Sequence, residues 1–429
     1  MAGPGQQEQV FVKCAKRLIP FIMLLYFFNY LDRVNVGFAA LTMNRDLGFS
    51  AAVYGLAASI FFVSYAIFQI PATMTLERLG ARRAVAIIMA AWGAVSAGTA
   101  FVTEPTGFYT ARFLLGVAEA GFFPGIILYL TFWFPREYRA RFTAIFMAAI
   151  PLSSTFGGPL SGLLLGLDNL HGLRGWQWLF LIEGLPACAL ALAVLKFLPD
   201  GPHQAAFLSA DEKRYIATRL AAEQPAAPAS PWPGLYDPRV LLLGLAGTGI
   251  NAAIFGNGLW LPQIVKSLGY TNLTTGFIIA LPYMLGIPIM LLVARSSDRR
   301  GERVWHTAIP LLVTASGFAV AATAHNPFVV IAGLTAVVWG LVGTYGPYYS
   351  LASSFFAGPS APASIALVNL MCTGAGGFIG PNVIGLLKEA TGGYAAGMLA
   401  LSGGLVISVL ILLLLGKVMA QRSPVLAKA

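Results

Sequence analysis

The sequence predicts an all-α integral membrane protein in which twelve transmembrane helices form two six-helix halves. Three observations support this fold class: an apolar composition, twelve long apolar segments, and short motifs that recur in both halves. Of the 429 residues, 57% are hydrophobic and only 10% are charged, and the mean hydropathy is +0.75. A soluble domain carries about a quarter charged residues, so much of this protein's surface must face lipid.

A helix that crosses the hydrocarbon core of a bilayer needs about 20 mostly apolar residues. Twelve stretches meet this requirement: residues 18–41, 52–76, 84–102, 108–132, 142–166, 176–198, 240–265, 274–294, 305–324, 327–351, 363–387 and 394–418. The first of them follows a few basic residues, as a secretory signal does, but it runs on too long and has no small-residue cleavage site. We therefore expect it to be a retained helix.

Basic residues orient these segments, because loops on the cytoplasmic side retain lysine and arginine. With the N-terminus inside, 21 of the 27 basic residues fall on the inner side, 4 on the outer side and 2 within spans. The sequence thus predicts a multi-pass protein of the cell membrane with both termini in the cytoplasm. The net charge of +10 is explained by this topology, and we expect no nucleic-acid partner.

One long hydrophilic segment separates the sixth span from the seventh. It contains "LSADEKRYIATRLAAEQ", which predicts a surface helix, and then the Pro/Ala-rich "PAAPASPWPG", whose composition is typical of a linker. We therefore expect an N-terminal half at residues 1–198, a cytoplasmic linker at 199–239 and a C-terminal half at 240–429.

The two halves repeat each other in sequence. The loop motif "ERLGARR" at 77–83 recurs as "DRRGERV" at 298–304, an offset of 221 residues, and Gly-Pro pairs at 158 and 380 are 222 apart. Parallel repeats related about the membrane normal, with a site between them, are a transporter architecture. We expect the loop residues to act as a conformational latch, and the Gly-Pro pairs to serve packing or hinge motion. The latch residues are Glu77, Arg78, Arg82, Asp298, Arg299 and Arg303.

Charged residues inside the predicted spans are the main functional signal. Asp32 and Arg33, in "YLDRVNVG", follow Leu18 by 14 residues or more, which is about 21 Å into a core of about 30 Å. Neighbouring residues on a helix point about 100° apart, so this pair needs partners on other helices or in a water-filled cavity. Arg112 and Glu119, seven residues apart in span four, share one helix face.

Intramembrane ionisable residues cost at least about 2.5 kcal/mol each on insertion scales, so function is the default interpretation. The alternatives are a snorkelling side chain for Arg112 and, for Glu119, an ion pair that only fixes helix packing. Carboxylates near guanidiniums can couple to protons, because desolvation and an arginine shift a carboxyl pKa in opposite directions. Glu183 in span six is expected to link helices. The hydroxyls of Tyr30 and Tyr65 could face a cavity, although aromatic residues in spans more often pack.

The sequence offers little for catalysis or cofactors. The three cysteines lie far apart and the four histidines sit in loops or at span ends, so we expect no disulfide, metal site, cofactor or histidine proton relay. The sequence also contains no recognisable motif for a nucleophile–base arrangement or a phosphate-binding loop. We therefore expect the protein not to be an enzyme.

In these motifs the sequence resembles the major facilitator superfamily and, within it, the anion:cation symporter family of organic-anion transporters. The resemblance rests on "YLDRVNVG", "ERLGARR", "RFLLGVAEAGFFPG", "YLTFWFPREYRAR", "GWQWLFLIEGLPA", "LPDGPHQAAFLSADEK" and "NLMCTGAGGFIGP", and it covers nearly the whole chain. The loop motif is shared across the superfamily, whereas the span-one and span-four motifs together are more specific.

The resemblance implies proton-driven uptake of a small carboxylate, such as a sugar acid, tartrate or an aromatic acid. It implies protonation at Asp32 and Glu119, and a role for Arg33 and Arg112 in neutralising these acids or binding the substrate carboxylate. Further substrate-binding candidates match positions that line the family's cavity: Tyr30, Tyr65, Asn369 and Tyr349, the last where relatives have tryptophan. Ala120-Gly121 in place of Ala-Pro and Glu77 in place of Asp are further departures.

The expected function is therefore proton-coupled symport of an organic anion by alternating access, in a chain that acts as a monomer in the lipid bilayer. Anion exchange and sodium coupling on the same fold remain alternatives. A drug exporter of this superfamily would more naturally have an acidic, aromatic cavity for cations, whereas this sequence places two arginines within its spans.

Overall fold

The structure is a computed structural model that describes residues 4–223, 236–355 and 361–422. Within these residues it consists of helices, turns and loops. The first half contains α1 (Pro4–Leu47), α2 (Ala51–Leu79), α3 (Ala81–Gly98), η1 (Thr99–Phe101), α4 (Pro105–Glu119), α5 (Phe122–Thr131), α6 (Arg136–Met147), α7 (Ala149–Leu164) and α8 (Gly175–Phe197). The 3-10 helix η2 (Pro202–Gln204) and α9 (Ala210–Ala221) follow.

The second half contains α11 (Pro238–Lys266), α12 (Asn272–Arg300), α13 (Val304–Thr323), α14 (Pro327–Phe355), α15 (Ala361–Leu370), the π-helix η3 (Met371–Gly376), α16 (Gly377–Thr391) and α17 (Ala395–Arg422). Four of the long helical runs consist of more than one element, namely α3–η1, α4–α5, α6–α7 and α15–η3–α16. Each of the twelve predicted spans coincides with a helix or such a run, so the predicted fold class is confirmed.

Eleven of the runs are long and apolar enough to cross a membrane by length and composition. Helix α1 is not among them, although it is the longest at 44 residues. Polar residues such as Asn29, Asp32, Arg33 and Asn35 interrupt its apolar stretch and lower its hydropathy. It also begins before the predicted residue 18, because the polar N-terminal part is helical as well. The predicted span, residues 18–41, lies within α1, and the helix extends beyond it at both ends.

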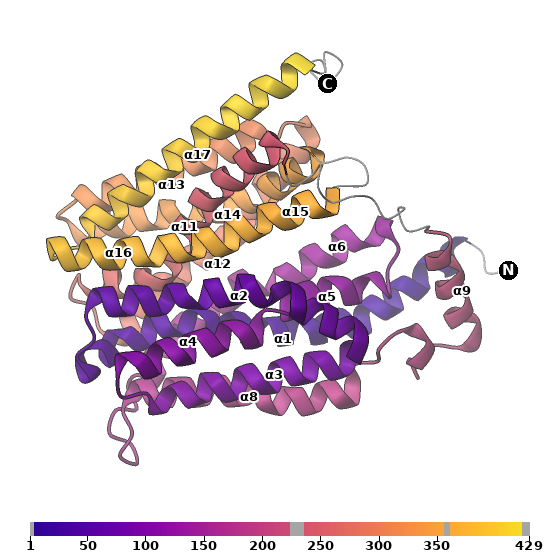
Figure 1. Ribbon diagram of the computed structural model, residues 1–429, viewed down its shortest axis with the longest axis horizontal. Coiled ribbons are helices and arrows are strands. Elements are labelled where there is room, and N and C mark those ends of the chain that lie inside the picture. The colour runs from indigo at the N-terminus through magenta and orange to yellow at the C-terminus, as the bar shows by residue number, and fades with distance from the viewer. Residues whose placement is uncertain (1–3, 224–235, 356–360, 423–429) are drawn as a thin grey trace.

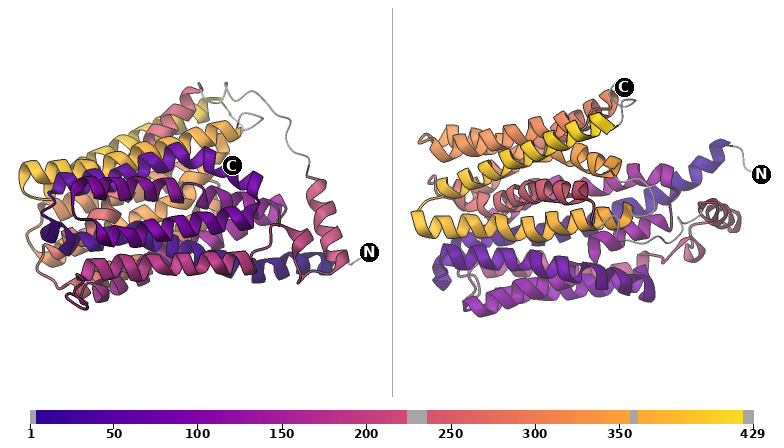
Figure 2. Two further views of the ribbon diagram at one scale, coloured as in Figure 1. Left: turned by 60° about the horizontal axis from the view of Figure 1, so that its bottom comes forward. Right: turned by 45° about the horizontal axis from the view of Figure 1, so that its top comes forward.

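The helices form two bundles that lie side by side (Figures 1 and 2). The indigo and magenta helices α1–α8 form one bundle, and the orange and yellow helices of the second half form the other. The bundles meet where α2 packs on α16 and where α7 packs on α12, while α1 contacts α11. The start of α1 and the end of α17 lie at the same end of the molecule (Figure 1).

The predicted surface helix in the segment after span six is α9, which begins at the N-cap Ser209. It lies beyond the end of the bundle, next to the start of α1 (Figure 1). Lys13 Nζ lies 2.9 Å from Glu212 Oε2, and this hydrogen bond lowers the pKa of Glu212. Arg219 pairs with Glu137 of α6. Ion pairs therefore attach α9 to the first half.

Candidate functional site

The charged residues that the sequence placed inside the spans lie close together within the first half. Arg33 on α1 donates from Nη2 to Oε2 of Glu119 on α4 at 2.9 Å, and its Nε lies 3.3 Å from the same oxygen. The side chains are 10% and 0% exposed. Arg33 thus pairs with a carboxylate on another helix, and Asp32, its neighbour in the chain, has different partners.

Glu119 uses only one of its two oxygens in this pair. Both nitrogens of Arg33 contact Oε2, whereas Oε1 is buried without a hydrogen-bond partner among the described residues. A buried carboxylate oxygen that lacks a donor is costly. The arrangement therefore leaves Oε1 available for a proton while Oε2 faces Arg33.

Asp32 points toward α3 and is held by neutral donors. Its carboxylate accepts hydrogen bonds from Trp92 Nε1 at 2.9 Å, Ser96 Oγ at 2.8 Å and Asn35 Nδ2 at 3.2 Å. The side chain is fully buried. Sequence reasoning missed Trp92 and Ser96, although their spacing of four residues places them on one face of α3. The two carboxyls thus differ in environment, because Glu119 pairs with an arginine, whereas the hydrogen-bond donors to Asp32 are neutral and its charged neighbours are the carboxyls of Glu119 and Glu183.

Arg112 is buried without an ion-pair partner among the residues described. It is 2% exposed, so it does not snorkel to the surface as the alternative interpretation allowed. Its guanidinium lies 4.8 Å from the ring centroid of Phe61, and its Nε and Nη2 have no hydrogen-bond partner in the described part of the chain. A cation–π contact offsets part of the desolvation cost of a buried arginine. The positive charge and the N–H groups on these two nitrogens therefore remain available, and a carboxylate could accept hydrogen bonds from them.

The predicted tyrosines lie around Arg33. The guanidinium is 5.0 Å from the ring centroid of Tyr65, and Arg33 also interacts electrostatically with Tyr30. Tyr349 of α14 is 45% exposed and interacts electrostatically with Tyr65 in the other half. These residues therefore meet at the interface between the halves. Asn369 is half-buried near the end of α15, the helix that η3 follows. No contact between Asn369 and Arg33 or the three tyrosines is seen among the described residues.

Glu183 on α8 belongs to a neighbouring polar cluster. It is buried and accepts a hydrogen bond from Ser161 Oγ of α7 at 2.9 Å. It also interacts electrostatically with Asp32. The bond to Ser161 joins α7 to α8, in agreement with the expected helix-linking position.

The described contacts of the predicted latch residues do not cross between the two halves. In the first loop, the backbone N–H of Arg82 donates to Asp200 at 2.8 Å, and Arg78 is exposed; Glu77 lies in α2, but its side chain is outside the described part. In the second loop, Arg303 pairs with Asp298, while no described contact involves the side chain of Arg299. A latch between the halves stays a prediction.

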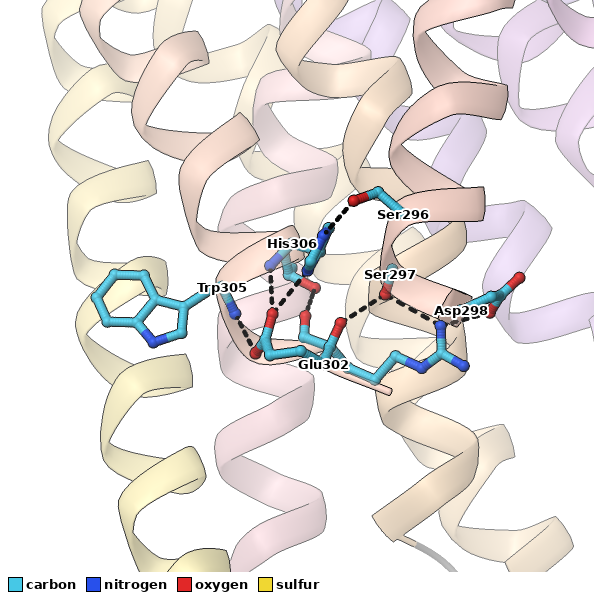
Figure 3. A network of polar contacts seen from close by, with 8 residues as sticks. Ser296, Ser297, Asp298, Glu302, Trp305 and His306 are labelled. Atoms are coloured by element: carbon cyan, nitrogen blue, oxygen red, sulfur yellow. Dashed lines mark hydrogen bonds and ion pairs between the residues drawn. The ribbon is translucent and has the colours of Figure 1, made fainter. Parts of the chain in front are cut away.

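The second loop forms a compact polar network that joins α12 to α13 (Figure 3). Ser297 Oγ donates to the backbone oxygen of Glu302 at 2.7 Å and accepts from Arg303 at 3.0 Å. Glu302 in turn accepts the backbone N–H of Trp305 and lies 2.7 Å from Nδ1 of His306. The network satisfies N–H groups at the start of α13, so it holds the loop in one conformation.

The described contacts between the halves run from the middle of the bundle to the end opposite α9. The hydroxyl of Tyr54 donates to the backbone oxygen of Leu259 at 2.8 Å, and the backbone N–H of Ala52 donates to Glu389. A Cβ on Gly158 would lie 2.6 Å from the backbone oxygen of Gly276, so these two helices touch through their backbones. The structure is therefore closed at the end that lies away from α9.

Comparison with known proteins agrees with this architecture. Residues 22–381 match the family model described as "Major Facilitator Superfamily". A protein of Agrobacterium vitis named "Putative tartrate transporter" is 48% identical over 414 residues, which cover 96% of this chain and 95% of that protein. The "Putative metabolite transport protein NicT" of Pseudomonas putida is 38% identical, with 97% and 96% covered. A "Quinolone resistance transporter" of Acinetobacter baumannii is 39% identical, with 90% of each covered.

Solved structures show the same fold at low sequence identity. A bacterial homologue of the human lysosomal transporter Spinster, in an inward-facing and occupied conformation, superposes with a TM-score of 0.78 at 16% identity, covering 93% of this chain and 96% of that one. The xylose transporter XylE of E. coli gives a TM-score of 0.71 at 14% identity, covering 94% and 97%. The family match, the relatives and the fold agree: this multi-pass membrane protein belongs to the major facilitator superfamily, and it is a secondary transporter rather than an enzyme.

Proposed function

We propose that the protein is a proton-coupled symporter that takes up a small organic anion, of which tartrate is the first candidate. The observation that supports this most directly is the arrangement of Arg112, Arg33 and Glu119. Arg112 is a buried cation without an ion-pair partner among the described residues, and Arg33 is occupied by the single carboxylate of Glu119. The names of the relatives as tartrate transporters favour a hydroxylated carboxylate.

Coupling follows from competition for Arg33. While Glu119 is ionised, its Oε2 holds the guanidinium of Arg33. A proton on Glu119 removes that charge, so Arg33 becomes free to bind a substrate carboxylate with two parallel hydrogen bonds. Substrate and proton therefore bind together, because either alone leaves a buried charge without a partner. We assign a second proton site to Asp32, whose neutral donors suit a carboxyl that changes its protonation.

The remaining predicted residues have supporting roles in this proposal. Tyr30, Tyr65 and Tyr349 would contact the substrate beside Arg33, and Asn369 would reach it in another conformation. In alternating access, the end of the bundle away from α9 would open. The loop motifs at 77–83 and 298–304 would then close the end near α9. The predicted cytoplasmic position of both termini would make the present structure inward-facing.

Transport in sodium-free proteoliposomes tests the proposal. Purified protein is reconstituted, an inward proton gradient is imposed, and labelled tartrate, galactonate, glucarate and phthalate are offered separately. We expect accumulation of tartrate above the external concentration, and loss of that accumulation with a protonophore. Uptake that requires sodium would instead support sodium coupling, and uptake that requires an anion loaded inside the vesicles would support anion exchange.

A further inference from the structure

One contact between the halves joins the carboxylate of Glu389 to the start of α2. Oε2 of Glu389, near the end of α16, accepts a hydrogen bond from the backbone N–H of Ala52 at 3.1 Å. Ala52 is the second residue of α2, so this N–H is one of the donors that the first turn of a helix cannot satisfy internally. A carboxylate of the second half thus caps a helix of the first half, at the helix end where the dipole favours negative charge.

The backbones of α2 and α16 hold Glu389 in this position. A Cβ on Gly55 would lie 3.0 Å from Cα of Gly385, and a Cβ on Gly385 would lie 2.7 Å from the backbone oxygen of Ala51. The two helices therefore touch where α2 begins (Figure 1). Glu389 follows Gly385 by four residues, so it lies one turn further along the same face of α16, beside the end of α2.

The internal repeat shows that capping such a helix does not require a carboxylate from the other half. Each helix begins at an N-cap whose hydroxyl accepts the N–H three residues later, Ser50 in α2 and Thr271 in α12. These N-caps are 221 residues apart, the same offset as the loop motifs. The position that corresponds to Glu389 in the first half, 222 residues earlier, is Leu167, whose side chain cannot accept a hydrogen bond. Glu389 therefore adds a contact between the halves that the repeated position cannot make.

The exposure of Glu389 suits a contact that breaks and re-forms. Its side chain is exposed, so water can hydrate the carboxylate when the halves separate, and release leaves no buried charge unpaired. The neighbouring contact of Tyr54 is different, because its buried hydroxyl donates to Leu259 at 2.8 Å and its ring lies edge-on to Trp260, with 4.8 Å between centroids. A buried neutral contact thus closes this end of the bundle, and the charged contact of Glu389 lies at its exposed edge.

We propose that Glu389 is a gating residue of the outer end, which stabilises the inward-facing state by capping α2 and is released when the outer end opens. This inference rests on the proposed alternating access and adds a residue that sets the balance between the two states. An outward-facing site binds external substrate with an apparent affinity that is reduced by the fraction of protein facing outward. Glu389 would therefore lower the apparent affinity for external substrate without contacting it.

Two cysteine reporters measure this balance in detergent-solubilised, full-length protein from which the three native cysteines have been removed. Thr275→Cys, buried at the closed end, reacts with a maleimide when that end opens. Tyr349→Cys, at a position that is 45% exposed in this structure, becomes covered when the opposite end closes. We expect Glu389→Gln and Glu389→Ala to raise the labelling rate at position 275 about 3-fold, the size of effect that one exposed charge at a helix N-terminus gives, and to lower the rate at position 349.

A matched control and the pair of reporters separate gating from damage to the fold. Glu104→Gln makes the same chemical change at an exposed glutamate before α4, in a loop at the same end of the bundle, where the side chain makes no capping hydrogen bond. It should leave both labelling rates unchanged. General loosening of the structure would raise both rates together, whereas a shift toward the outward-facing state moves them in opposite directions.

The labelling rates require no substrate, so they test this inference separately from the proposed function. An unchanged rate at position 275 in both Glu389 variants, or a rise at both reporters, would overturn the gating role even if tartrate is transported with protons. Rates that move in opposite directions would support it even if none of the offered anions is carried.

Discussion

Arg33 and Glu119 form a buried ion pair in which two nitrogens of the guanidinium contact a single carboxylate oxygen, with the shorter contact at 2.9 Å. The pair joins α1 to α4, and the second oxygen of Glu119 has no described partner. The proposed coupling of proton and substrate depends on this geometry, because the pair can be broken either by a proton or by a competing carboxylate.

Glu119→Gln should abolish accumulation driven by a proton gradient but preserve exchange of labelled for unlabelled tartrate. The amide imitates the protonated acid, so Arg33 stays free for substrate while no proton is released. Counterflow in the absence of a gradient measures the exchange. If counterflow is also lost in a variant that melts normally, Glu119 is required for binding itself and the coupling role is wrong.

Arg33→Lys should weaken tartrate binding about 10-fold or more, because an ammonium cannot offer two parallel hydrogen bonds to a carboxylate. The charge is retained, so the pair with Glu119 and the fold should survive. Calorimetric titration of tartrate into detergent-solubilised protein gives the affinity. Arg45→Lys, at an exposed position, is the matched control and should bind as the parent does; an unchanged affinity for Arg33→Lys would remove it as the carboxylate ligand.

Arg112→Met should stop transport and at the same time stabilise the protein. A buried arginine without an ion-pair partner is costly, and replacing buried ionic groups by apolar ones of similar size can stabilise by about 1–4 kcal/mol. Thermal unfolding monitored by tryptophan fluorescence measures the stability, and tartrate uptake measures the function. A clear fall in melting temperature would mean that Arg112 supports the fold through its contact with Phe61.

Gly158→Leu should hold the closed end of the bundle apart and so inhibit transport. A side chain at position 158 would collide with the backbone of Gly276 in the other half. Gly403→Leu is the control, because Gly403 has open space around it. Thr275→Cys, buried beside Gly276, reports the opening through its reaction with a membrane-impermeant maleimide in a cysteine-free background. Equal labelling rates in the Gly158 and Gly403 variants would contradict the role assigned to this contact.

The helices and the positions of the charges could be predicted from the sequence, because apolar length and cost of burial are properties of single segments. The side chains that these charged residues contact could not be predicted from the sequence. Arg112 and Glu119 share a helix face, yet Glu119 pairs with Arg33 of α1, since the rotation of α4 against its neighbours is decided by packing. For the same reason the donors to Asp32, Trp92 and Ser96, were missed. The ion pair between Lys13 and Glu212 joins residues far apart in sequence, which no local pattern reveals.

Proton movement caused by the substrate itself tests the central claim most directly. Protein in sodium-free proteoliposomes is loaded with a pH-sensitive dye, no gradient is imposed, and tartrate is added outside while lumenal pH is recorded. The account predicts acidification of the lumen that depends on tartrate, is absent from protein-free vesicles and is absent with Glu119→Gln. Tartrate uptake without any change of lumenal pH would contradict it.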